Sequence, residues 1–336
     1  MSVEPPDIRW GLVGASDIAE TRLIPAMRRL GHNVVAVASG SPDRAASFAD
    51  RNGIPASGSV DEILARDDID AVYISSTNEH HRPQTELAAA AGKHVLCEKP
   101  LALSVDDGRA MIAACERAGV IFATNHHLPG SGIHRTIRHL VADGAVGRVL
   151  GVRVFHAVML PARLQGWRLA NQAGGGVTMD ITCHDASVLN PLLGAVPSDV
   201  VALAATQGPW GAATEDAVMS TLRYADGTLA QTHDAFTIPY SPTGLQVLGS
   251  EGSIEAVGAM VQDPTGTILL RDPSGEREVE PDDRRDLYEI NVAAFAAAVR
   301  GEGSPTATGL DGLRAIQVAL AVREAVESGR RVSITE

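Results

Sequence analysis

The chain has 336 residues, of which 45% are hydrophobic and 4% aromatic, and its formal net charge is −13. This length suits two domains with aliphatic cores better than one. The charge argues against a nucleic acid partner, because no basic surplus is available to displace counterions from phosphates. Three cysteines without CxxC spacing, and no signal-like start, predict a cytoplasmic protein. No apolar run has the length of a membrane span, so no membrane partner is expected.

The first part of the chain alternates apolar runs with amphipathic segments. We expect strands at residues 8–13, 33–39, 71–77, 94–100 and 120–124, and helices at 18–30, 42–52, 59–70, 81–92 and 104–118. Strands that are apolar throughout and alternate with helices are typical of a parallel sheet covered on both faces. Right-handed crossovers then give a doubly wound α/β domain over residues 1–125.

Beyond residue 125 the strand-like runs follow one another. They lie at residues 147–158, 198–207, 215–236, 244–257 and 266–272. The run 215–236 predicts a hairpin with Asp226 and Gly227 at its turn. Two helices, at residues 286–300 and 310–328, close the chain. This order predicts a second, α+β domain over residues 126–336 with an open, largely antiparallel sheet.

The segment GLVGASDIAE follows the first strand and opens the first helix. Aligned with the dinucleotide fingerprint, Gly14 takes the tight turn, Ser16 the second glycine position and Ala19 the third. Such a turn brings a pyrophosphate to the N-terminus of a helix. An ordinary strand-to-helix turn is the alternative, but the position in the first βα unit favours a nucleotide and a Rossmann domain.

The end of the second strand bears on the choice of cofactor. An NAD site usually has an acidic residue there to bind the ribose hydroxyls, whereas this chain has SGSPDR. Ser39, Ser41 and Arg44 could receive a 2′-phosphate, and Asp43 could cap the next helix. Arg44 on a solvated helix face is the alternative interpretation. The pattern favours NADP(H).

Two further segments carry residues suited to acid–base chemistry. CEKP places Lys99 at the carboxyl end of a predicted parallel strand, where ligands of such sheets bind. In GGGVTMDITCHDAS the glycines would let the backbone pass close to a ligand, and Thr178 or Asp180 would start a helix. Asp180 and His184 then share a face, so that the carboxylate orients the imidazole. A helix cap with a structural histidine, or two metal ligands, are alternatives; no third ligand is evident, so no metal is expected.

The chain resembles the glucose–fructose oxidoreductase/inositol dehydrogenase/MocA family through GLVGASDIA, STNEHH, GKHVLCEKPLA, GGGVTMDITCHD and its closing segment. The resemblance runs over nearly the whole chain and implies that Lys99, His184 and Asp180 are catalytic. With the motifs above, the cofactor is expected at Gly14, Ser16, Asp17, Ile18, Ser39, Ser41, Arg44, Ser76, Thr77, Asn78, His81, Glu98, Lys99, Trp167 and Arg168. The substrate is expected at Asn125, His126, Asp180 and His184.

The function that this resemblance implies is the NADPH-dependent reduction of the ketone of a sugar such as 1,5-anhydro-D-fructose. Lys99 would stabilise the developing oxyanion and His184 would donate the proton, although these roles could be exchanged. The small-molecule sugar is the expected partner, and the family also allows a homo-oligomer. Alternatives are an NAD(P)-dependent inositol or aldose dehydrogenase of the same family, and a non-catalytic dinucleotide-binding sensor.

Overall fold

The computed structural model describes residues 8–171 and 173–335. The chain divides into two compact units, each described here by itself. Unit 1 comprises Met1–His127 with Asp286–Leu313, and unit 2 comprises Leu128–Arg285 with Arg314–Glu336. The sequence predicts a division at residue 125; in the structure, the segment Asp286–Leu313 returns to the N-terminal unit.

A six-stranded parallel sheet forms the centre of unit 1, as the alternating pattern predicts. Its strand order is β3-β2-β1-β4-β5-β6, the order of a doubly wound dinucleotide-binding fold. The strands are β1 (Arg9–Val13), β2 (Asn33–Ala38), β3 (Ala56–Gly58), β4 (Ala71–Ile74), β5 (His94–Cys97) and β6 (Phe122–Thr124). The short strand β3 is absent from the predicted set, because three residues with two small side chains carry no strand periodicity.

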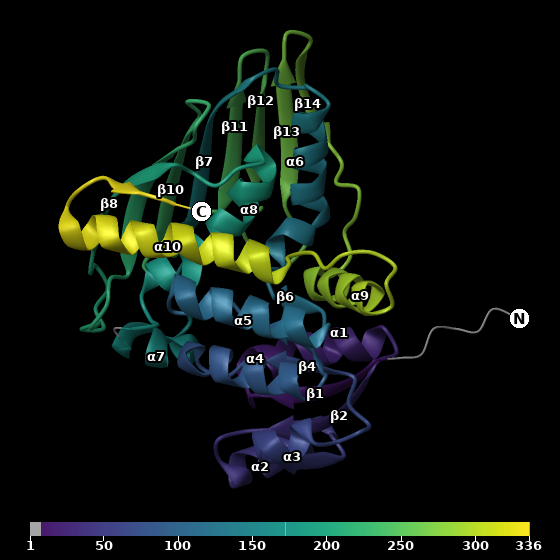
Figure 1. The fold of residues 1–336 in the computed structure, drawn as a ribbon. Helices are drawn as coiled ribbons and strands as arrows, with labels where there is room; N and C mark the ends of the chain where they lie inside the picture. Colours follow the sequence, from purple (N-terminus) through teal and green to yellow (C-terminus); the bar gives the residue numbers. More distant parts are fainter. Residues whose placement is uncertain (1–7, 172, 336) are drawn as a thin grey trace, which may run out of the picture. The chain divides into compact units, whose positions relative to one another are not determined.

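Helices cover the sheet of unit 1, with α4 packed against α5 and α1 against α9 (Figure 1). The helices are η1 (Ala19–Leu23), α1 (Ile24–Arg29), α2 (Pro42–Asn52), α3 (Val60–Leu64), η2 (Asn78–His80), α4 (His81–Ala90), α5 (Val105–Ala118) and α9 (Leu287–Val299). The core around Trp10, Leu12 and Tyr73 includes Phe295 of α9, whose ring centroid lies 5.2 Å from that of Trp10. These aromatic contacts explain why α9 belongs to unit 1.

Unit 2 contains a nine-stranded sheet in the order β14-β13-β12-β11-β7-β10-β9-β8-β15. Its strands are β7 (Val149–Ala157), β8 (Asp199–Ala205), β9 (Ala217–Arg223), β10 (Leu229–Ala235), β11 (Gly244–Gly249), β12 (Ser253–Val257), β13 (Thr267–Asp272), β14 (Gly275–Val279) and β15 (Val332–Ser333). The β7–β10 pair is parallel and the other described pairs are antiparallel. The predicted open, largely antiparallel sheet is therefore confirmed, and Gly227 turns the β9–β10 hairpin with φ +91°.

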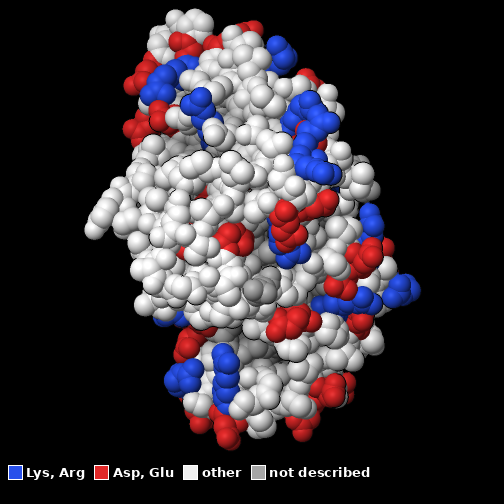
Figure 2. Space-filling view, turned by 90° about the vertical axis from the view of Figure 1, so that its left-hand side faces the viewer, with Lys and Arg blue, Asp and Glu red and all other residues white. Residues whose placement is uncertain are grey.

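Helices α6 and α8 and most of α10 lie on one face of this sheet (Figure 1). The helical elements are η3 (Leu128–Gly130), α6 (Gly132–Ala142), η4 (Ala162–Leu164), α7 (Gln165–Ala170), η5 (Thr178–Thr182), α8 (Cys183–Leu193) and α10 (Gly309–Ser328). The sequence analysis predicts neither α6 nor α7. On the other face, Leu203 and Met219 are opposite one another on β8 and β9 and are 80% and 51% exposed. One side of the molecule shows a wide area with few charged residues (Figure 2).

Two helical segments contain π-helical turns that the sequence does not predict. The expected helix 18–30 begins with the π-turn η1 before α1. The helix that carries His184 begins with the π-turn η5, and its backbone is helical already at Val177. The expectation that Thr178 or Asp180 caps this helix is therefore wrong. Both π-turns occur in the segments singled out for cofactor binding and catalysis, where such turns are common. Within the described residues, no helix is both long and apolar enough to cross a bilayer.

Candidate active site

The glycine turn of unit 1 has the geometry that the fingerprint requires. Gly14 adopts φ +122°, and a Cβ atom there would lie 2.7 Å from the backbone of both Ser75 and Ser76. Helical backbone starts at Asp17, three residues later. Ser16, in the second glycine position, accepts a hydrogen bond from the Ala19 N–H at 3.2 Å and donates to Ser75 at 2.7 Å. The serine in this glycine position therefore links the turn to Ser75, the residue that follows β4.

An arginine of α2, Arg44, lies beside this turn. Strand β2 ends at Ala38, and Ser41 caps α2 by accepting a hydrogen bond from the Arg44 N–H at 3.4 Å. The Arg44 guanidinium donates to the carbonyl of Ala15 at 2.8 Å. The cap of α2 is therefore Ser41 rather than Asp43. A guanidinium, two serine hydroxyls and a helix N-terminus are donors that suit a phosphorylated dinucleotide, so the residues present fit the cofactor.

The EKP segment follows β5, and a hydrogen-bond network holds its glutamate. Oε1 of Glu98 accepts from the Asn125 amide at 2.5 Å and from the Tyr73 hydroxyl, while Oε2 accepts from the Lys99 N–H at 3.2 Å. Asn291 of α9 donates to Oδ1 of Asn125. Burial raises the pKa of Glu98 and of Tyr73. This network fixes the backbone from which the Lys99 side chain extends.

Other predicted cofactor and substrate residues of unit 1 surround the same strand ends. The buried His81 ring reaches the carbonyls of Pro100 at 3.1 Å and Ser76 at 3.2 Å, which links α4 to β4 and to the EKP segment. Thr77 precedes η2, and Asn78 is buried in it. His126 is fully buried; burial and then the Lys99 charge lower its pKa to about 3, so it is neutral at physiological pH.

The glycine run of unit 2 approaches protein backbone. A Cβ on Gly175 would lie 2.6–2.8 Å from the carbonyl oxygens of Asn171, Arg168 and Trp167. Gly176 has φ +86°, and its Cβ would collide with the Glu215 carboxylate. Glu215 accepts from the Thr178 N–H at 3.1 Å and so serves the helix start. The glycines are thus needed for contacts with α7 and with Glu215, a residue that the sequence analysis missed.

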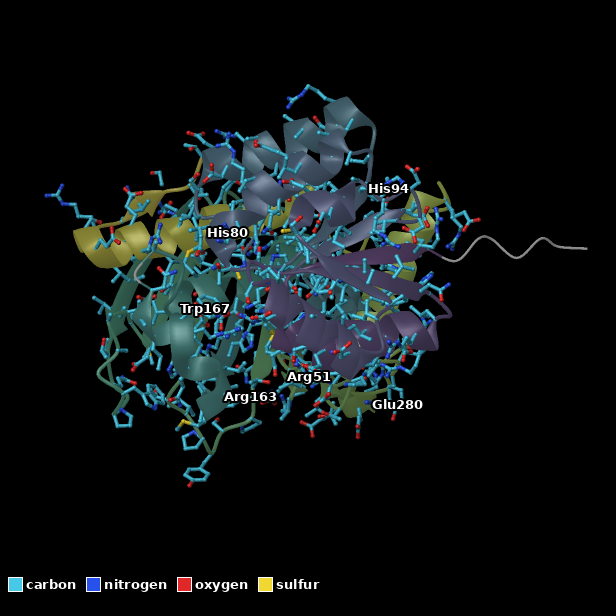
Figure 3. The ribbon with its side chains drawn as sticks, turned by 90° about the horizontal axis from the view of Figure 1, so that it is seen from below. Arg51, His80, His94, Arg163, Trp167 and Glu280 are labelled. Carbon is cyan, nitrogen blue, oxygen red and sulfur yellow. The ribbon has the colours of Figure 1, made fainter. Side chains whose placement is uncertain are left out.

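The predicted Asp180–His184 pair lies on the first turns of the helix formed by η5 and α8. Both residues are buried, with 5% and 6% of their surface exposed. Arg168 donates from Nε to Oδ2 of Asp180 at 2.9 Å, and its guanidinium lies 4.7 Å from the ring centroid of Trp167. Trp167 and Arg163 belong to α7 and the preceding turn η4 (Figure 3). The structure therefore places Trp167 and Arg168 beside the Asp180 turn.

The sequence-predicted residues thus form one group in each unit. Unit 1 brings together the glycine turn, the Arg44 side chain and the EKP segment, and unit 2 brings together Trp167, Arg168, Asp180 and His184. Three partners were missed because nothing local marks them: Tyr73 lies inside an apolar strand, and Asn291 and Glu215 lie 166 and 37 residues from the groups they bind. Among the described residues, no three His, Cys, Asp or Glu side chains are grouped to hold a metal ion.

A doubly wound unit with a dinucleotide turn, together with a second unit built on a nine-stranded sheet, characterises a class of pyridine-nucleotide oxidoreductases, and comparison with known proteins agrees. A model described as "Oxidoreductase family, NAD-binding Rossmann fold" matches residues 8–126, and one for the GFO/IDH/MocA C-terminal domain matches residues 134–255. The chain is a member of the Gfo/Idh/MocA family of oxidoreductases.

Relatives match along the whole chain. A 1,5-anhydro-D-fructose reductase from Ensifer adhaerens is 47% identical over 328 residues, which cover 97% of this chain and 98% of that protein. D-xylose 1-dehydrogenase (NADP(+)) 2 from Haloferax volcanii is 32% identical, over 97% of this chain and 99% of that protein. The aldose-aldose oxidoreductase structure from Caulobacter crescentus superposes with a TM-score of 0.88 at 28% identity, over 98% of this chain and 100% of that one.

Proposed function

We propose that this protein reduces the ketone of a sugar, with 1,5-anhydro-D-fructose as the first candidate and NADPH as the reductant. The observation that carries the proposal is the 47% identity to a 1,5-anhydro-D-fructose reductase over 97% of the chain. The buried Asp180–His184 turn and the Lys99 segment supply acid–base groups that such a reduction needs. The product of that substrate is 1,5-anhydro-D-mannitol.

The cofactor would be held mainly by unit 1 and would supply the hydride when bound. The N–H groups at the helix start near Asp17 and Ile18 would bind the pyrophosphate. Ser39, Ser41 and Arg44 would receive the 2′-phosphate, and the hydrogen bond from Arg44 to Ala15 at 2.8 Å holds the guanidinium beside the glycine turn. This arrangement supports NADP(H) over NAD(H), because no carboxylate at the end of β2 binds the ribose hydroxyls.

The protein residues then act on the carbonyl oxygen of the sugar. As the carbonyl carbon gains a hydride, its oxygen becomes negative. The Lys99 ammonium stabilises that charge and His184 donates the proton, which leaves a neutral alcohol. Asp180, steadied by Arg168 at 2.9 Å, orients the His184 ring. The neutral His126 lies near Lys99 and lines the sugar site without adding a second positive charge there.

A substrate panel tests this function directly. NADPH consumption is measured with 1,5-anhydro-D-fructose, other sugar ketones and aldoses, and NADP⁺ reduction is measured with the corresponding alcohols, inositols and D-xylose. Rapid NADPH oxidation with 1,5-anhydro-D-fructose is expected. The relative that is a D-xylose 1-dehydrogenase favours one alternative, oxidation of an aldose, and faster turnover of D-xylose with NADP⁺ would establish it. Binding of NADPH without turnover of any sugar would instead favour the other alternative, a non-catalytic dinucleotide-binding sensor.

We extend the proposal to a homo-oligomer formed through the open face of the unit 2 sheet. Leu203, Met219, Leu229 and Val201 are exposed on the adjacent strands β8, β9 and β10. Apolar side chains grouped on a sheet face commonly mark a protein interface. Light scattering at micromolar concentration should report more than one chain per particle, and Leu203→Asp should shift the particle mass towards that of the monomer. A wild-type monomer over this concentration range would contradict this part of the proposal.

A further inference from the structure

Four buried polar side chains beside His184 have no part in the proposed mechanism so far. They are His156 of β7, Asp234 of β10, Thr182 at the end of η5 and Asp185 of α8. Thr182, Asp185 and Asp234 are 0% exposed, and His156 is 6% exposed. We call these four residues the carboxyl cluster. Burying two carboxyl groups and an imidazole in this way is costly unless each polar atom has a partner.

Contacts within the cluster connect two strands and a helix. His156 and Asp234 are directly opposite in the parallel β7–β10 ladder. Asp185 reaches the strands from α8, and its Oδ1 lies 2.7 Å from Nδ1 of His156. Thr182 donates to Oδ2 of Asp234 at 2.5 Å. The cluster therefore fastens the first turn of α8 to the sheet.

The remaining oxygens require a shared proton. Among the described residues, no donor reaches Oδ2 of Asp185 or Oδ1 of Asp234. The two carboxyl groups can hydrogen-bond to each other only if one of them holds a proton. Burial raises the pKa of both groups, that of Asp185 to about 7, and the neighbouring Asp185 raises that of Asp234 further. The two carboxyl groups therefore hold one proton between them, and Asp185 accepts from Nδ1–H of His156.

This arrangement adjoins the proposed proton donor. His184 immediately precedes Asp185 on α8, and the ring centroids of His156 and His184 are 6.1 Å apart. Other charged or titratable groups around these rings are Asp180 with its partner Arg168, and His134 of α6, which senses His156 electrostatically. Asp185 follows His184 in the chain and is in contact with the His156 ring.

We propose that His156, Asp185 and Asp234 are positioning residues for His184, holding one shared proton and one negative charge behind it. The negative charge acts on His184 across the intervening His156 ring. It favours the protonated form of the His184 imidazole, from which the sugar oxygen takes its proton. The fastening of α8 to β7 and β10 fixes the direction from which His184 is presented. This inference rests on the proposed function only in giving His184 the role of proton donor.

Two variants separate the charge from the hydrogen bonds. Asp234→Asn keeps the pattern, because its amide can donate to Asp185 and its oxygen can accept from Thr182. The double variant Asp185→Asn/Asp234→Asn removes the charge altogether. We expect D234N to keep kcat within about threefold of the wild type. In the double variant, the alkaline limb of the kcat–pH profile should move to lower pH by about half a unit or more, with KM for the sugar little changed.

The matched control is Thr232→Val on the same strand. Thr232 is buried and shares a 2.8 Å hydrogen bond with Ser220, so its loss disturbs packing without removing a charge. T232V should lower stability but leave the position of the alkaline limb unchanged. An unshifted alkaline limb in the double variant would overturn the proposal, since it would leave the cluster a merely structural role. An equal shift in T232V would also overturn it, since it would show that altered packing alone moves the limb.

A measurement without substrate tests the shared proton independently. The folded protein holds a proton that an unfolded Asp has lost above about pH 4, so the contribution of this proton to the unfolding free energy should fall as pH rises from 5 to 8. D234N should remove about one proton from this dependence, measured as the slope of the unfolding free energy against pH. An unchanged slope would refute the shared proton even if the double variant did not fold. A wild type that turns over no sugar would instead refute the proposed function.

Discussion

Arg168 and Asp180 form a largely buried ion pair at 2.9 Å, with 19% and 6% of the side chains exposed. The pair joins α7 to the turn that precedes His184. Breaking it leaves a buried carboxylate without this donor, and hydrogen bonds to charged groups contribute about 1.5–3 kcal/mol. Because Asp180 orients His184 in the proposed mechanism, the same change should also affect turnover.

Arg168→Ala should therefore lower the unfolding free energy by about 2 kcal/mol and kcat by about tenfold or more. Denaturant unfolding and steady-state kinetics measure the two effects. The control is Arg153→Ala on β7, at an exposed position of unit 2, which should change neither by much. A wild-type kcat in R168A would show that turnover does not depend on the ion pair between Asp180 and Arg168.

Lys99→Ala and His184→Ala should each lower kcat by about two orders of magnitude or more, since each removes an acid–base or charge-stabilising group. Binding of NADPH, followed by its fluorescence, should change little in His184→Ala. Asp180→Asn should also impair turnover, through misorientation of His184. Near-normal turnover in the folded lysine and histidine variants would remove the basis of the mechanism.

Arg44→Ala should weaken NADPH binding by about 10- to 100-fold and leave NADH binding nearly unchanged, because a charge-assisted contact with the 2′-phosphate is lost. The ratio of kcat/KM for the two cofactors measures this. Arg51→Ala on the same helix (Figure 3) is the control: Arg51 pairs with Glu20 and does not reach the glycine turn in the described contacts. A wild-type protein that prefers NADH would contradict the assignment of NADP(H).

Gly176→Ala should destabilise unit 2 by about 2 kcal/mol or more, and should lower kcat. Two costs add: the left-handed φ of +86° and the collision of the new Cβ with Glu215. Gly194→Ala is the matched control, because Gly194 also has positive φ, at +65°, but nothing lies within 4 Å of its Cβ position. It should show only the conformational cost, of about 1 kcal/mol. Equal effects in the two variants would mean that the loop can move away from Glu215.

Asp283 offers a pH-dependent test of unit 2. Hydrogen bonds from Arg285 lower its pKa to about 2. A lowered pKa stabilises the fold above the ordinary pKa of Asp, and this contribution is lost as pH falls from about 4 to 2. Asp283→Asn should therefore reduce stability at pH 7, and its difference from the wild type should shrink as the pH approaches 2. A difference that is constant with pH would contradict this.

Local patterns were sufficient for the parts of the molecule whose structure is decided within a few residues. The strand–helix alternation, the Gly14 turn and the hairpin at Asp226–Gly227 follow from periodicity and glycine conformation. The EKP and Asp180–His184 segments could be proposed as functional for the same reason, since spacing along a strand or helix sets which side chains lie together.

Contacts between distant segments decided the rest. The sequence shows a run of glycines at Gly174–Gly176. Only the fold shows that a Cβ atom there would collide with the carbonyls of α7 or with the Glu215 carboxylate. The return of α9 to unit 1 depends on the packing of Phe295 against Trp10. The carboxyl cluster depends on the register that sets His156 opposite Asp234, and on the angle at which α8 brings Asp185 to them. Neighbours along the chain do not fix a register or a packing angle, because these minimise the energy of whole surfaces in contact.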